Sequence, residues 1–373
     1  MPAITGSIRR SRRLVFAVVA VIAILVLAAA TAIVVLRQVA VSGAEDDNRR
    51  LTVVLAEQTT RTVQAVDVVL QDISEKIAAS GVHDDVSFHQ AFGTRDLHEM
   101  LVRRLTDLPQ AEAITILDST DHFVNVSRRW PPPEYGLAER SYFRHCATTP
   151  DSGPYPYISE PATSVSSGAA TAFLVRRLSA CGGTFLGVIV APILLDYFER
   201  FFVKAGFATG QGVIILRRDG TVLVRFPREG VATGTRMPPH HQWFDVVAQG
   251  GGHYRSPGAF KAVQPSLVSV HVLTLYPLVV DVTRSNAATL ARWWRQAVAI
   301  GLGTLLTTVS LALLLRALGR QFTLIVDAQA RIDAQVIMLS ESAPPGSHPR
   351  RPCRPEPHVP VMAAALRKLC RPQ

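Results

Sequence analysis

Two long apolar stretches divide the chain. The first covers residues 14–36 and the second 297–315, and neither contains a charged residue. As a helix, each stretch is long enough to cross a hydrocarbon core of about 30 Å. We therefore expect two transmembrane helices, with a folded domain between them on one side of the membrane.

The apolar positions after the first span keep a helical period and then change to short runs. Residues 45–80 and 96–108 repeat apolar side chains every three or four positions, which predicts two helices. Further on, short apolar runs bounded by Gly, Asp and Pro predict strands. The predicted strands are 113–117, 122–126, 155–159, 171–178, 184–191, 212–216, 221–225, 252–256, 267–274 and 278–282. Short helices are predicted at 137–146, 194–204, 242–248 and 285–295.

The order of these elements occurs twice. A hairpin at 113–126 is followed by a short helix and more strands, and a second hairpin starts at residue 212 and is followed in the same way. The Asp219-Gly220 pair in the second hairpin is typical of a tight turn. We therefore predict an α+β fold, with two tandem α/β modules on a long N-terminal helix, between two transmembrane helices.

Beyond the second span, one helix face has a heptad repeat. Its apolar seam, with one polar interruption, consists of Leu318, Phe322, Ile325, Gln329, Ile332, Val336 and Leu339. This spacing predicts a parallel pair of helices and hence a homodimer, to which the 45–80 helix would also contribute. The alternative is an amphipathic helix lying on the membrane surface. The following Pro- and Arg-rich tail is expected to be disordered.

Charge next to the spans predicts the topology. Arginines 9, 10, 12 and 13 precede the first span, and such residues stay preferentially in the cytoplasm. We expect a two-pass protein of the cell inner membrane, with both termini cytoplasmic and the domain periplasmic or extracellular. The predicted parts are 1–13 (cytoplasmic), 14–36 (transmembrane), 37–205 (long helix and first module), 206–285 (second module), 286–296 (connecting helix), 297–315 (transmembrane), 316–340 (heptad helix) and 341–373 (tail).

These features allow two further interpretations. The first span could be a cleaved signal peptide, because residues 30–32 resemble a cleavage site, although the apolar run is longer than usual. The formal net charge of +10 could indicate nucleic acid. However, the charge is spread over membrane flanks and tail, without a basic helix interleaved with aromatics, so no nucleic-acid partner is expected.

Four cysteines are present, and two of them, Cys146 and Cys181, lie in the outer domain. Disulfides form in such compartments, so these two residues either pair or remain separate buried thiols. Cys353 and Cys370 fall on the predicted cytoplasmic side and are expected to be free. No metal site and no cofactor are expected.

Several motifs occur in the order found in a known family. They are 139–143 (Glu-Arg-Ser-Tyr-Phe), 159–161 (Ser-Glu-Pro), 176–178 (Arg-Arg-Leu), 187–190 (Gly-Val-Ile-Val) and 196–198 (Asp-Tyr-Phe). Together with the layout, they resemble the double Cache (PAS-like) extracytoplasmic sensors that precede diguanylate cyclases and sensor histidine kinases. The resemblance covers residues 40–290 and implies a pocket for a small extracellular molecule in the membrane-distal module.

The resemblance also suggests which residues bind. Tyr135, Arg140, Tyr142 and Phe143 are similar to the Tyr-x4-Arg-x-Trp-Tyr motif of the amino-acid-binding version. That version also has an aspartate that holds the ligand's ammonium group, and here Pro192 stands in its place. The departure argues against an amino-acid ligand.

The chemistry of these residues supports an anionic ligand. Arg140 with Tyr142 can bind a carboxylate through bidentate hydrogen bonds, and Arg176 or Arg177 can add a second positive group, since only one of two neighbours on a strand faces inward. We take Arg176 as the candidate. The alternatives are a structural ion pair for Arg140, core packing for the three aromatic residues and a solvated face for the strand arginines.

No catalytic motif is recognised. The chain lacks a nucleophile elbow, a zinc-protease helix, a phosphate loop and the signatures of a cyclase or kinase, so no enzymatic activity is expected. The prediction is a membrane-anchored sensor that binds a small, carboxylate-bearing ligand and signals to a separate output protein. The alternatives are a truncated receptor, or a scaffold that binds no ligand.

Overall fold

The computed structural model describes residues 2–134, 140–149, 155–164, 167–180, 182–228, 232–258 and 265–341. The chain divides into a larger unit, Ala23–Thr304, and a second unit made of Met1–Ile22 and Leu305–Gln373. The described residues of the second unit are helical and belong to α1 (Pro2–Ala79) and α7 (Asn286–Glu341). The predicted disordered tail lies, apart from its first residue, outside the described residues.

Both long helices pass through the predicted spans without a break. The helical stretches Val15–Ala79 and Asn286–Gln321 each contain an apolar window long enough to cross a membrane, and neither window is buried. Within the larger unit, the ring nitrogen of Trp293 donates a hydrogen bond to the carbonyl oxygen of Ile33 at 2.9 Å. This bond joins α7, just before the second predicted span, to α1 near the end of the first predicted span.

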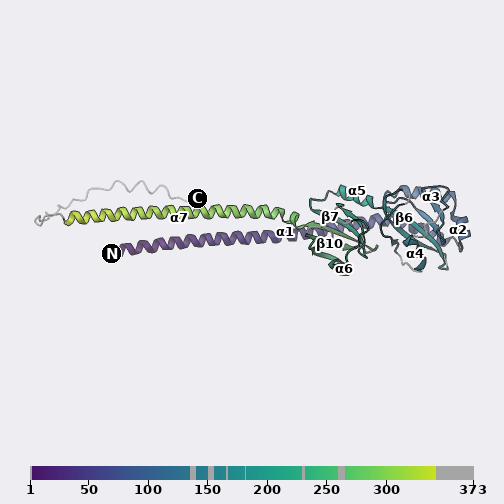
Figure 1. Ribbon diagram of the computed structural model, residues 1–373, viewed down its shortest axis with the longest axis horizontal. Helices are drawn as coiled ribbons and strands as arrows, with labels where there is room; N and C mark the ends of the chain where they lie inside the picture. The colour runs from purple at the N-terminus through teal and green to yellow at the C-terminus, as the bar shows by residue number, and fades with distance from the viewer. Residues whose placement is uncertain are drawn as a thin grey trace, which may run out of the picture. The chain divides into compact units, whose positions relative to one another are not determined.

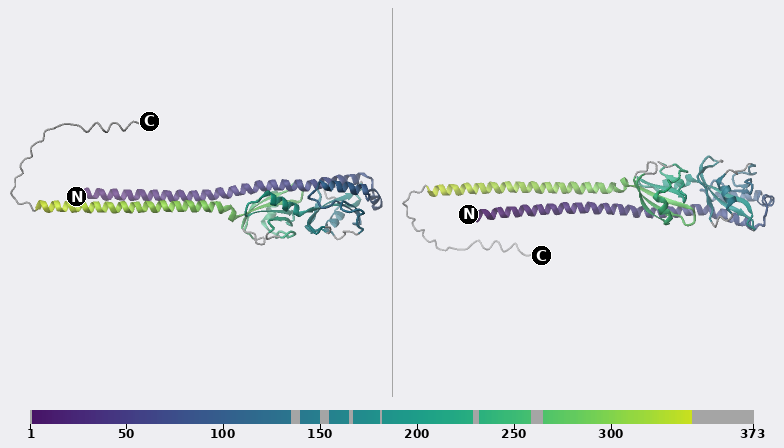
Figure 2. Two further views of the ribbon diagram at one scale, coloured as in Figure 1. Left: turned by 90° about the horizontal axis from the view of Figure 1, so that it is seen from above. Right: turned by 60° about the horizontal axis from the view of Figure 1, so that its bottom comes forward.

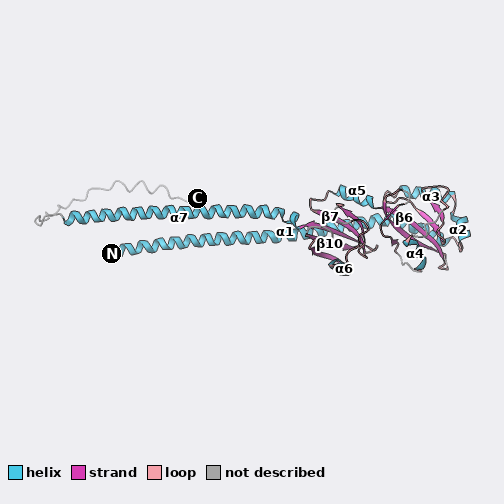
Figure 3. Ribbon diagram, viewed as in Figure 1, coloured by secondary structure: helices cyan, strands magenta, loops and turns pink. Residues whose placement is uncertain are grey.

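The first module is built on an antiparallel sheet with the strand order β2-β1-β6-β5-β3, and β4 also pairs with β5 (Figures 1 and 3). Its strands are β1 (Thr115–Asp118), β2 (Phe123–Val126), β3 (Tyr157–Ile158), β4 (Ala162–Thr163), β5 (Ala170–Ser179) and β6 (Phe185–Leu194). Its helices are α2 (Asp85–Phe92), α3 (Arg95–Thr106) and α4 (Ser141–Thr148).

The second module repeats this plan in a smaller form. Its sheet has the order β8-β7-β11-β10-β9, and neighbouring strands are antiparallel. The strands are β7 (Gln211–Arg217), β8 (Val222–Phe226), β9 (Gly251–Ser256), β10 (Ser266–Val272) and β11 (Leu278–Ser285). Helix α5 (Leu195–Ala205) connects the modules, and α6 (Gln242–Ala248) packs against β9 and β10.

Helix α1 runs along both modules (Figure 2). One apolar core follows it and includes one face of each sheet. Leu70 and Ile73 of α1 share this cluster with Ile116 and Ile189 of the first sheet and Val280 of the second. Side chains alternate between the faces of a strand, so the intervening residues form separate clusters on the opposite faces. In the first module that opposite face carries α4, and there the candidate site lies.

The predicted α+β fold with two tandem modules is confirmed. Two elements were missed, the short helix α2 and the two-residue strand β4. The start of α2 has a recognisable signal, because the Asp84 side chain accepts a hydrogen bond from the backbone N–H of Ser87, as an N-cap residue does. The predicted 137–146 helix begins at Ser141 in the part that is described and continues to Thr148.

Candidate ligand-binding site

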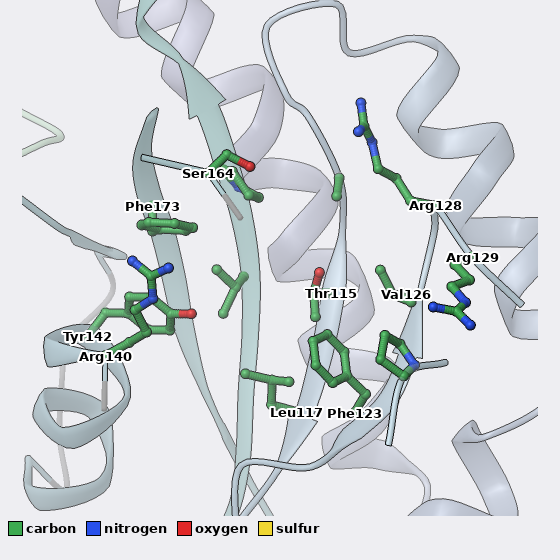
Figure 4. A pocket seen from close by; sticks show the side chains of 14 residues that line it. Thr115, Leu117, Phe123, Val126, Arg128, Arg129, Arg140, Tyr142, Ser164 and Phe173 are labelled. Carbon is green, nitrogen blue, oxygen red and sulfur yellow. The ribbon is translucent and has the colours of Figure 1, made fainter. Parts of the chain in front are cut away.

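A cavity of about 280 Å³ opens on the α4 side of the first sheet (Figure 4). This volume suits a small ligand, because pockets for drug-sized molecules start at about 300 Å³. The lining residues are Ala113, Thr115, Leu117, Phe123, Val126, Arg128, Arg129, Pro133, Arg140, Tyr142, Ser164, Phe173, Val190 and Pro192. None of these described residues is acidic, so the cavity has a positive lining.

Strand pairing brings the floor of the cavity together. Thr115 of β1 lies opposite Val190 of β6, and Pro192 of β6 lies opposite Phe173 of β5. Residues paired across an antiparallel sheet share a face, and residues two apart on one strand do so as well. The alternation of the sequence therefore places these four side chains beneath one opening.

Arg140 and Tyr142 form one wall around the ring of Phe173. Arg140 directly precedes α4 in extended conformation, and its side chain makes no capping hydrogen bond. Its guanidinium carbon lies 5.6 Å from the centroid of the Phe173 ring, and the Tyr142 ring centroid lies 5.0 Å from the same point. Burial raises the pKa of Tyr142, against the opposing effect of Arg140, so the phenol stays protonated and able to donate.

Arg128 and Arg129 come from the segment that follows β2. Arg128 donates from Nε to the carbonyl oxygen of Glu112 at 3.0 Å and lies 3.4 Å from its carboxylate. The Glu112 side chain is buried, so this pair fixes Arg128 at the cavity. Within the described parts of the chain, no carboxylate forms an ion pair with Arg129 or Arg140.

The structure brings together two of the predicted binding residues, Arg140 and Tyr142. Phe143 does not line the cavity but packs edge-on against Phe185, with ring centroids 5.9 Å apart, in the adjoining apolar cluster. Arg176 lies on the other face of the sheet, where it forms a bidentate ion pair with Asp67 of α1. Its predicted place in the binding site therefore does not agree with the geometry. Tyr135 lies outside the described residues.

The neighbouring Arg177 faces the α4 side but also misses the cavity. Its guanidinium carbon lies 4.5 Å from the centroid of the Phe185 ring, and it donates to the carbonyl oxygen of Cys146. Burial raises the pKa of the Cys146 thiol to about 11, with a smaller opposing effect from Arg177. In the structure Cys146 is a free and buried cysteine, which agrees with the alternative of separate thiols and not with the disulfide; Cys181 lies outside the described residues.

Pro192, which the sequence resemblance places where the amino-acid-binding version has aspartate, lines the cavity. A proline side chain cannot balance an ammonium group. The site residues that were missed include Arg128, Arg129 and Phe173. Phe173 is three positions before Arg176 on β5, so the two side chains face opposite sides of the strand. Once Arg176 is assigned to one face, this spacing predicts that Phe173 lies on the other face.

No protein family matches the chain, and no curated protein sequence matches it. Among solved structures, the chain is similar to the extracellular domain of rpHK1S-Z16, a protein described as a histidine kinase. The two are 28% identical, the match covers 68% of this chain and 98% of that domain, and the TM-score is 0.57.

Two chemoreceptor domains are more distant matches. The periplasmic sensory domain of Campylobacter jejuni Tlp1 is 12% identical, with 67% of this chain and 98% of that one covered and a TM-score of 0.49. The ligand-binding domain of Pseudomonas fluorescens CtaA, in complex with L-alanine, is 12% identical, with 66% and 98% covered and a TM-score of 0.46.

The tandem sheets on α1 and the match to rpHK1S-Z16 define the class of this protein as an extracytoplasmic sensory domain. Its fold is that of a double Cache sensor, as the sequence resemblance implied. With two helices able to span a membrane, the protein is a membrane-anchored sensor whose domain lies outside the cytoplasm.

Proposed function

We propose that the protein is a receptor for a small carboxylate-bearing molecule, which binds in the distal cavity and changes the state of the membrane helices. One observation carries this proposal. Arg140 lines the cavity beside the buried Tyr142, and in the described structure no protein carboxylate pairs with it. An arginine remains charged at all physiological pH values, so a bound anion would supply the missing counter-charge.

The geometry around Arg140 suits a carboxylate. A planar guanidinium can donate two parallel hydrogen bonds to the two oxygens of a carboxylate, and such charge-assisted pairs are among the stronger hydrogen bonds in proteins. Tyr142 adds a neutral hydroxyl donor, and Phe173 supplies an apolar wall. This combination favours binding over catalysis, and we propose no enzymatic activity for the chain.

Signal transfer is proposed to follow the helices. A ligand that binds one conformation more tightly shifts the two-state balance by its differential affinity. The shift would pass through the second module and α7 to the heptad helix at 318–339. We further propose that this helix and residues 45–80 pair with a second copy, that both termini are cytoplasmic and that a separate output protein receives the signal.

The proposal can be tested with the full-length protein in nanodiscs. Its thermal unfolding should be followed in the presence of carboxylates, amino acids, amines and nucleobases, each added alone. A ligand at 100 times its Kd stabilises the folded state by about 2.7 kcal/mol, which is a visible shift of Tm. We expect a carboxylate to raise Tm, and we expect the Arg140→Gln variant to lose the shift.

Arg144→Gln is the matched control, since Arg144 is on α4, the helix that Arg140 directly precedes, and does not line the cavity. It should keep the shift. If no carboxylate changes Tm, or if Arg140→Gln retains the full shift while folded, the proposal is wrong.

A further inference from the structure

We infer that the ligand is a dicarboxylate, with one carboxylate held by Arg140 and the other by Arg129. This inference rests on the proposed function of the distal cavity and adds the chemical class of its ligand. It is carried by the charges of the lining residues, by their positions on opposite sides of the cavity and by the apolar surface between them.

The cavity lining offers two arginines that can each bind an anionic group. Three arginines line it, and Glu112 balances one of them through its ion pair with Arg128. Arg129 and Arg140 remain, and in the described part of the chain neither has a carboxylate partner. Arg129 is exposed and can be hydrated without an anion. One carboxylate occupies one guanidinium by bidentate hydrogen bonds, so a ligand with a second carboxylate gains a further charge-assisted pair at the other arginine.

The two arginines stand on opposite sides of the cavity. Arg140 lies beside Tyr142 and Phe173, whereas Arg129 lies beyond Val126, across Thr115 and Phe123 (Figure 4). In the sheet, Phe173 is on β5 and Arg129 follows β2, with β6 and β1 between them. Three inter-strand spacings of about 4.8 Å separate the backbones of these two walls by roughly 14 Å. The two arginine side chains do not turn toward each other across this gap, and their guanidinium groups lie at opposite ends of the lining (Figure 4).

The surface between the two arginines is mainly apolar. Leu117, Phe123, Val126 and Val190 line it, with the hydroxyl group of Thr115 among them. Such a surface accommodates a short hydrocarbon body that connects two charged ends. Pro192 and the absence of acidic side chains in the described lining favour a simple dicarboxylate over an acidic amino acid, whose ammonium group would find hydroxyl acceptors but no carboxylate to balance its charge.

Matched pairs of ligands test the inference. The full-length protein in nanodiscs should be titrated by calorimetry with succinate, glutarate and adipate, and with butyrate, pentanoate and hexanoate as monocarboxylates of equal length. Glutamate is added as the amino-acid counterpart of glutarate. We expect at least one dicarboxylate to bind about tenfold or more tightly than its monocarboxylate partner, and glutarate to bind more tightly than glutamate.

Two variants test the two ends of the site one at a time. Arg129→Gln should remove the advantage of the dicarboxylate while changing the Kd of the monocarboxylate by less than about twofold, whereas Arg140→Gln should weaken both ligands. Arg103→Gln is the control, because Arg103 is an exposed arginine of the same module outside the cavity. It should leave both Kd values unchanged, and circular dichroism should verify that all variants are folded.

The outcomes distinguish this inference from the proposed function. Monocarboxylates that bind as tightly as dicarboxylates, or a dicarboxylate advantage that persists in Arg129→Gln, would overturn the two-ended site and leave the carboxylate receptor intact. Tighter binding of glutamate than of glutarate would also overturn it. If neither class of carboxylate binds, the proposed function fails together with the inference.

Discussion

Asp67 of α1 accepts two hydrogen bonds from Arg176 of β5, with Nε–Oδ1 and Nη2–Oδ2 distances of 2.7 and 3.0 Å. The hydroxyl of Tyr276, from the segment between β10 and β11, donates to Oδ2 of the same carboxylate at 3.1 Å. One carboxylate of the long helix is therefore bonded to residues of both modules. Arg176 is on the strand that also supplies Phe173 to the opposite, cavity-lining face.

We expect the Asp67→Asn substitution to destabilise the outer domain by about 3 kcal/mol, because breaking a largely buried ion pair costs more than breaking an exposed one. The amide cannot provide the two charged acceptors that Arg176 now contacts. Only 10% of the Asp67 side chain and 14% of the Arg176 side chain are exposed. Chemical unfolding of the full-length protein, followed by tryptophan fluorescence, measures the change.

Glu57→Gln is the matched control on the same helix. Glu57 pairs with Arg61, but their side chains are 59% and 70% exposed. Its loss should change the free energy of unfolding by less than about 0.5 kcal/mol. Equal effects of the two substitutions would show that the Asp67 pair contributes no more than a surface pair.

The carboxylate of Asp281 is expected to make the second module sensitive to pH. Asp281 is fully buried on the α6 face of β11, and burial raises its pKa well above the usual value, although the hydrogen bond from Trp243 Nε1, at 2.8 Å, acts in the opposite direction. The folded state therefore retains a proton that the unfolded chain releases. The contribution of Asp281 to the free energy of unfolding is therefore fully present below the unfolded pKa near 4. It is lost as pH rises through the folded pKa.

The Asp281→Asn variant removes this dependence and keeps an acceptor for Trp243. When both proteins are measured from pH 4 to pH 8, we expect the free energy of unfolding of the variant, relative to the wild type, to rise with pH until the folded pKa of Asp281 is passed and to be constant above it. Asp245→Asn, which changes an exposed aspartate of α6, is the control and should show no growing advantage. A constant difference for Asp281→Asn across this range would contradict the prediction.

Gly187 is required for β1 to approach β6. It has φ of 138°, and a Cβ atom there would lie 2.0 Å from the carbonyl oxygen of Leu117 and 2.8 Å from the carbonyl carbon of Asp118. Since both atoms belong to backbone, the strands themselves would have to move. We expect Gly187→Ala to cost about 3 kcal/mol in thermal or chemical unfolding. Gly182→Ala, where a Cβ meets open space, should change stability by less than about 1 kcal/mol.

The fold could be predicted because local periods in the sequence are clear. The helical period of 45–80 changes to short apolar runs at residue 113, and Asp219-Gly220 marks the second hairpin. Helix α2 was missed because eight residues carry little periodic signal, and only Phe88 is buried. Strand β4 was missed because it has two residues, which are stabilised by pairing with β5.

The site could be predicted only in part. When both faces of a strand are buried, the sequence does not show which face a given side chain occupies. Residues 171–175 of β5 are all buried, so burial does not show which side Arg176 takes. Its partner Asp67 is 109 residues away and cannot be identified from local sequence. Arg128 and Arg129 follow a strand, and only the sheet order places them across the cavity from Arg140.

The heptad seam beyond the second span predicts a specific crosslink. α7 continues as a helix to Glu341, as the heptad pattern requires. In a parallel coiled coil, seam residues of two copies face each other, whereas residues on the outer face are too far apart for a disulfide. Ile332→Cys, at the seam, should therefore crosslink efficiently in native membranes under mild oxidation. Asp327→Cys, on the outer face, should not.

Both cysteine variants need a background with Cys353→Ser and Cys370→Ser, because the native thiols could form crosslinks of their own. If the receptor transfers a signal by a population shift, adding glutarate should change the crosslinking rate of Ile332→Cys by about twofold or more. The additional Arg140→Gln substitution should abolish that change but leave the basal crosslink. Equal crosslinking at positions 332 and 327 would favour a helix lying on the membrane surface, because such a helix has no seam to distinguish the two positions.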